Sequence, residues 1–213
     1  MIYLDFEGYM NEKPSFVGYK IGSQFKQIIL DKNFLQLTKE TDIEFQEYEK
    51  LCEEIILVSN RTNQPIVAWS EYELTILKKF QDDINYCNLK KIVESKIKKD
   101  RNLTEIHKGM SQYWIGQRRT RIGKINLNNN PFLRKRWDLQ TVLKLLDYPH
   151  LNSTYGKGKV TARLTAIKKG LIRGGSYKKL TPIQKRKWTN LKQHNFIDVD
   201  GLEYIVKKLK ISY

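Results

Sequence analysis

The 213-residue sequence has only two cysteines, Cys52 and Cys87, so it has neither a disulfide framework nor a Cys/His cluster with zinc spacing. It has no run of the roughly 18–20 consecutive apolar residues that a membrane helix needs. Its start, Met-Ile-Tyr-Leu-Asp, lacks the basic segment and long apolar run of a signal peptide. These absences predict a soluble, cytoplasmic protein without membrane contact. A 40% hydrophobic content argues against global disorder, and the length predicts a single domain over residues 1–213.

Acidic residues are scarce in the second part of the chain. Residues 1–83 contain 9 Lys/Arg and 15 Asp/Glu, a net charge of −6, whereas residues 84–213 contain 30 and 8, a net charge of +22. Such asymmetry predicts binding to a polyanion, and nucleic acid is the expected partner, DNA ahead of RNA. A solubilising cationic surface and attachment to anionic lipid are the alternatives. The acidic and basic parts also permit docking within a larger protein complex.

The strand predicted over residues 1–8 carries two acids on one side. Side chains alternate between the faces of a strand, so Asp5 and Glu7 share one face. The other face is apolar, with Ile2, Leu4 and Phe6. Neighbouring carboxylates repel each other, and burying one without a partner costs free energy. A divalent cation would offset both costs, so Asp5 and Glu7 are candidate metal ligands.

A late helix carries a third acid inside a largely apolar stripe. Its members are spaced alternately by three and four residues: Trp188, Leu191, Asn195, Asp198, Leu202, Ile205 and Leu209. This spacing puts them on one helix face. Asp198 is therefore expected to point into the protein as another candidate ligand.

A fourth acid, Glu73, begins the inward stripe of a helix predicted over residues 70–80. Ser70-x-x-Glu73 is also the pattern of a capping box, which would explain Glu73 by hydrogen bonding at the helix end alone. Both interpretations stay open. Glu71 lies off the stripe and is the weaker candidate.

The remaining pattern alternates short strands with helices. Strands are predicted over residues 16–21, 25–30, 65–69 and 84–88. Helices are predicted over residues 41–58, from the strand at 84–88 to about residue 98, and over 138–146 and 160–169. A last helix is predicted to begin at Thr181-Pro182. Gly170, with Gly174-Gly175, is expected to interrupt the chain between the last two helices.

Residues 100–136 form the least regular part and are predicted to be a basic insertion that clamps nucleic acid. Cations would neutralise phosphates and aromatic rings would stack on bases. The candidate contacts are Tyr113, Trp114, Arg118, Arg119, Arg121, Arg134 and Arg136. An ordinary solvated loop is the alternative.

The four carboxylates, Asp5, Glu7, Glu73 and Asp198, are expected to converge at the end of a sheet. Hard cations such as Mg²⁺ and Mn²⁺ prefer oxygen ligands. Two such ions about 3.5–4 Å apart would activate water and stabilise the leaving oxygen in phosphodiester hydrolysis. Together with the basic second half, these acids predict a metal-dependent nuclease.

Three segments resemble motifs of a known family. Tyr3-Leu-Asp-Phe-Glu7 resembles the first motif of the DnaQ-like (DEDD) exonucleases of the ribonuclease H-like superfamily. Val67-Ala-Trp-Ser-Glu-Tyr-Glu-Leu-Thr-Ile-Leu77 resembles the Tyr-Glu variant of the second motif, and His194-Asn-Phe-Ile-Asp-Val199 resembles the last, commonly Tyr-Asn-x-x-Asp-Val. Their order and span match over the whole chain.

The resemblance implies an α/β fold with a mixed sheet flanked by helices, and 3′-to-5′ hydrolysis of a nucleic-acid strand. It makes Glu73 the third metal-binding acid, although the best-known members have Asp there. His194 precedes Asp198 by four residues, so the two lie on adjacent turns of one helix face. His194 is then a candidate to position or deprotonate the attacking water, or else a surface histidine on a basic helix.

Two other functions use the same features. A structure-selective endonuclease would need the same acids. A non-catalytic nucleic-acid-binding subunit of a larger complex would need only the basic surface.

Overall fold

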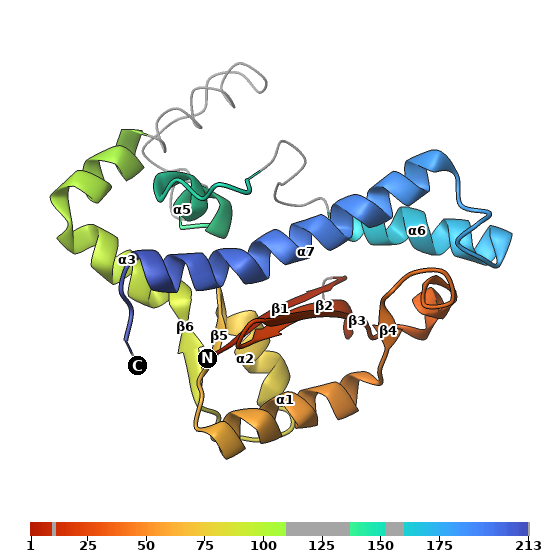
Figure 1. Ribbon diagram of the computed structural model, residues 1–213, viewed down its shortest axis with the longest axis horizontal. Helices are drawn as coiled ribbons and strands as arrows, with labels where there is room; N and C mark the ends of the chain where they lie inside the picture. The colour runs from red at the N-terminus through yellow and green to blue at the C-terminus, as the bar shows by residue number, and fades with distance from the viewer. Residues whose placement is uncertain (10–11, 110–136, 152–159, 213) are drawn as a thin grey trace.

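A mixed six-stranded sheet lies at the centre of the computed structural model, which describes residues 1–9, 12–109, 137–151 and 160–212 (Figure 1). Its strand order is β4-β3-β2-β1-β5-β6. The strands are β1 (Ile2–Gly8), β2 (Pro14–Ile21), β3 (Gln24–Ile29), β4 (Glu44–Phe45), β5 (Ile66–Ala68) and β6 (Tyr86–Asn88). Strand β1 pairs antiparallel with β2 and parallel with β5. The α/β class and the mixed sheet flanked by helices are thus confirmed.

Helices cover both faces of this sheet. The 3₁₀ helix η1 spans Lys32–Leu37, and the α-helices are α1 (Tyr48–Thr62), α2 (Glu71–Leu77), α3 (Leu89–Lys99), α5 (Leu139–Leu145), α6 (Val160–Gly174) and α7 (Pro182–Lys208). Helix α7 crosses one face, and α1 lies under the other (Figure 1). Among the described residues, no helix combines the length and apolar character of a membrane span.

Strand β1 separates two apolar cores because its side chains alternate. Ile2, Leu4 and Phe6 share one face, as expected from the sequence, and pack with α1 and α2 in one core. Tyr3 faces the other core, with residues of α3, α5 and α7. Asp5 and Glu7, which alternate with these three apolar residues, therefore lie on the face that α7 covers.

Helices α6 and α7 form a hairpin against β2, β3 and η1. They share an apolar core that includes Leu164, Trp188 and Leu191. The predicted interruption is wrong at Gly170, where α6 continues, but is confirmed at Gly174-Gly175, where α6 ends. A Cβ on Gly170 would lie 2.5 Å from Leu180 Cδ2, so this glycine permits close packing rather than ending the helix.

Two other sequence predictions need correction. The helix predicted over residues 41–58 begins only at Tyr48, because Glu44 and Phe45 pair with Ile28 and Ile29 as strand β4. Residues 101–109, expected to be irregular, are helical. Residues 110–136, and with them all seven predicted nucleic-acid contacts, lie outside the described residues.

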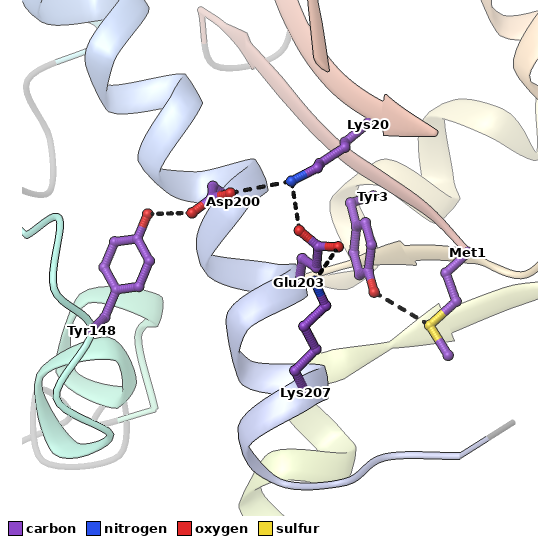
Figure 2. A network of polar contacts seen from close by, with 7 residues as sticks. All are labelled: Met1, Tyr3, Lys20, Tyr148, Asp200, Glu203 and Lys207. Carbon is purple, nitrogen blue, oxygen red and sulfur yellow. Dashed lines mark hydrogen bonds and ion pairs between the residues drawn. The ribbon is translucent and has the colours of Figure 1, made fainter. Parts of the chain in front are cut away.

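A polar network fixes the second half of α7 to the sheet and to the segment after α5 (Figure 2). Lys20 on β2 lies 3.3 Å from Asp200 Oδ1 and 2.5 Å from Glu203 Oε2. The Tyr148 hydroxyl donates to Asp200 Oδ2 at 2.8 Å, and Lys207 pairs with Glu203. The helix that carries Asp198 is thereby held in place just after that residue.

Candidate metal and active site

Strand β1 and helix α7 bring two predicted acids and the predicted histidine together. One ligand atom from each of Glu7, His194 and Asp198 lies within 4.8 Å of the others. His194 Nε2 is 3.3 Å from Asp198 Oδ2 and 3.7 Å from Glu7 Oε1. The His194 side chain is only 11% exposed, so it is not a surface histidine.

The predicted acids are removed from water and lie close enough together for their charges to raise one another's pKa. Burial, and next the charge of Asp198, raises the pKa of Asp5 well above its ordinary value. For Glu7, burial is again the largest cause of a raised pKa, followed by the charges of Asp5, Asp198 and Glu73. All four carboxylates therefore belong to one electrostatic cluster. Protons or a cation must compensate them.

Glu73 takes part in helix-end bonding and also lies within the electrostatic cluster of acids, while its role as a metal ligand stays a prediction. The Ser70 hydroxyl caps α2 by accepting from the Tyr72 N–H at 3.2 Å, and it donates to Glu73 Oε2 at 3.1 Å. Burial, and then the charge of Asp5, raises the pKa of Glu73 to about 8. Helix-end bonding alone would not place this acid beside Asp5. Glu71, by contrast, is exposed and pairs with Lys91 at 2.5 Å.

Asn195 holds Asp5 through contacts that the sequence did not reveal. Its side-chain amide donates to Asp5 Oδ2 at 2.9 Å and to the Asp5 carbonyl at 3.2 Å. Gln27 Nε2 in turn donates to Asn195 Oδ1 at 3.1 Å. Gly18 lies between them in register on β2, and a Cβ there would come within 2.0 Å of Asn195 Oδ1. The glycine makes room for the amide that orients Asp5.

Arg163 of α6 is a second residue that the sequence patterns did not single out. It is 5% exposed, and its guanidinium donates to the Asn190 carbonyl at 3.2 Å. Burial lowers its pKa, while the charge of Glu7 opposes that change. Only the basic composition of residues 84–213 hinted at a cation here, and composition cannot assign its position.

The donor set suits a hard divalent cation. Three of the four acids are under 10% exposed, and Glu7 Oε1 accepts no hydrogen bond among the described residues. Carboxylate oxygens are the ligands that Mg²⁺ and Mn²⁺ prefer, whereas an imidazole nitrogen suits transition metals such as Zn²⁺ better, so the carboxylates are the expected ligands. The geometry defines one cluster of three potential ligands, and a second ion stays a prediction.

Comparison with protein-family models gives no match for this chain, and comparisons with curated proteins and with solved structures give none either. The resemblance of its three motifs to DnaQ-like exonucleases therefore stays a prediction from the sequence.

Proposed function

We propose that this protein is a metal-dependent nuclease that hydrolyses a nucleic-acid strand, as a 3′-to-5′ exonuclease with a ribonuclease H-like arrangement. The observation that carries the proposal is the convergence of four carboxylates from β1, α2 and α7, three of them under 10% exposed, beside one imidazole. A mixed sheet whose first strand presents Asp5 and Glu7 toward Asp198 of α7 supports the arrangement that the three motifs imply.

Glu7 and Asp198, with Asp5 and Glu73 nearby, would hold the Mg²⁺ or Mn²⁺ ions. Ions bound there would supply Lewis-acid stabilisation of the negative charge that develops during hydrolysis. The Asn195 amide keeps the Asp5 carboxylate in one orientation. His194 Nε2 would take the proton of the attacking water, and the adjacent Asp198 carboxylate would stabilise the imidazolium that results.

The direct test is cleavage of a 5′-labelled single strand in Mg²⁺ or Mn²⁺. Asp5→Asn and Asp198→Asn are expected to lower the rate by about a hundredfold or more, because each removes several kcal/mol of charge stabilisation. Asp82→Asn is the matched control, since Asp82 is exposed. Cleavage that needs no divalent cation, or that persists undiminished in both site variants, contradicts the proposal.

A circular single strand separates exonuclease from endonuclease action by the same acids, because an exonuclease needs an end. Resistance of the circle alongside degradation of the linear strand is expected. Metal-independent binding without hydrolysis of either substrate would instead indicate a non-catalytic binding subunit.

A further inference from the structure

The α6–α7 hairpin, defined as residues 160–192, has an unusual charge. It contains ten Lys/Arg and no Asp/Glu. Its apolar side packs on η1, β2 and β3, which fixes the hairpin to the sheet. Its exposed cations are Lys169, Arg173, Lys178, Lys179 and Arg186.

No carboxylate within the hairpin neutralises these cations. Elsewhere in the described residues, seven lysines pair with carboxylates: Lys13, Lys20, Lys32, Lys91, Lys98, Lys108 and Lys207. None of the ion pairs in the described part of the chain involves a lysine of the hairpin. An ordinary solvated helix mixes charges of both signs, so a fixed surface of one sign is suited to a polyanion.

The hairpin also adjoins the carboxylate cluster. Its buried Arg163 is close enough to Glu7 for each charge to affect the other's pKa. Helix α7 leaves the hairpin at Lys192 and reaches His194 two residues later. One helix, α7, thus joins the cationic surface to the site. This connection does not depend on the clamp predicted over residues 100–136.

We infer that the outer surface of the α6–α7 hairpin binds the phosphate backbone of the nucleic-acid strand on which the site acts. The inference rests on the proposed function for what happens to the strand, but strand binding itself needs neither metal nor hydrolysis. The contacts are charge interactions with phosphates, so binding depends strongly on salt and little on base sequence.

The test is the affinity of the full chain for fluorescein-labelled single-stranded DNA in EDTA, as a function of salt. The variant is Lys178→Gln/Lys179→Gln/Arg186→Gln, three exposed positions. The control, Lys50→Gln/Lys78→Gln/Lys79→Gln, removes the same charge from exposed positions of α1 and of the end of α2. Circular dichroism melting checks that both variants fold.

The hairpin variant is expected to bind at least tenfold more weakly at low salt than the control. Its plot of log affinity against log salt should be shallower by about 2, since each lost phosphate contact removes about 0.7 from a single-strand slope. Equal affinities and slopes in the two variants overturn the inference, as does wild-type protein that does not bind DNA.

Two further measurements distinguish strand binding from lipid binding and from catalysis. Exposed Ile172 and Ile183 on the hairpin would also suit a lipid surface, so phosphatidylglycerol vesicles are tested in parallel. Hairpin-dependent vesicle binding with unchanged DNA binding overturns the inference. Hydrolysis of the p-nitrophenyl ester of thymidine 5′-monophosphate, which needs no strand, should be equal in both variants. If neither variant nor wild type hydrolyses it, the proposed function fails while hairpin-dependent DNA binding still stands.

Discussion

Glu7 illustrates at the scale of one residue why this site is suited to a cation. It is 8% exposed, its Oε1 accepts no hydrogen bond among the described residues, and three other carboxylates raise its pKa. A buried carboxylate in such surroundings either binds a proton or is offset by positive charge. Arg163 offsets part of this charge. The remainder is what a divalent cation would neutralise.

Glu73→Gln should stabilise the metal-free protein at high pH. The pKa of Glu73 is about 8 in the folded chain and ordinarily 4.5, so between these values the folded protein keeps a proton that the unfolded chain releases. Glu73 therefore costs stability progressively as pH rises from about 4.5 to 8. In EDTA, the midpoint temperature of thermal unfolding should be higher for the variant than for wild type at pH 8, but little different at pH 5. The expected shift is about 2–4 °C for each kcal/mol of unfolding free energy.

Glu71→Gln is the matched control on the same helix. Its carboxylate is exposed, and hydrogen bonds from Lys91 and Asn88 lower its pKa, so no gain at pH 8 is expected. If Glu73→Gln changes the midpoint of thermal unfolding by the same amount at both pH values, protonation of Glu73 does not cause the change.

Gly18→Ala and Asn195→Ala should be strongly non-additive. A methyl group at Gly18 must displace the Asn195 amide, and such overpacking costs about 1–3 kcal/mol of unfolding free energy. In the Asn195→Ala background that space is empty, so most of the cost should disappear. Urea unfolding of the double-mutant cycle measures this, with Gly109→Ala as a control whose Cβ would meet none of the described residues within 4 Å. Additive effects would show that the close approach is unimportant.

At the scale of the element, α7 is the helix on which the site depends. As the sequence predicted, Thr181 caps its start and Pro182 occupies its first turn, and Gln184 completes a capping box with Thr181. The 3–4 spacing correctly predicted its buried face, because that periodicity follows directly from helix geometry. The helix then places His194, Asn195 and Asp198 against β1 in a single element.

Lys20→Met should loosen this element from the sheet. The substitution leaves Asp200 and Glu203 without their shared cation, and a hydrogen bond to a charged group contributes about 1.5–3 kcal/mol. We expect a loss of about 1–3 kcal/mol in the free energy of unfolding by urea. Lys26→Met on the neighbouring strand is the control, because Lys26 is exposed. Equal stability of the two variants would mean that the network in Figure 2 contributes nothing.

At the scale of the whole molecule, the features that depend on local sequence patterns were predicted better than those that depend on tertiary contacts. Strand alternation placed Asp5 and Glu7 on one face, since it depends only on the backbone. The amide bridge from Asn195 could not be predicted, because it depends on the register of Asp5, Gly18 and Gln27 across three strands. The late start of α1 was missed for a similar reason: pairing with β3 overrides the helical pattern of residues 41–47.

Whether the carboxylate cluster binds a divalent cation can be measured by anomalous scattering from Mn²⁺ in crystals of the protein. We expect anomalous density between Glu7 and Asp198, close to Asp5 and Glu73, and loss of that density in Asp198→Asn. The Asp82→Asn control should retain it. Absence of anomalous density at these carboxylates, at Mn²⁺ concentrations that support cleavage of a labelled strand, would contradict a metal-dependent site.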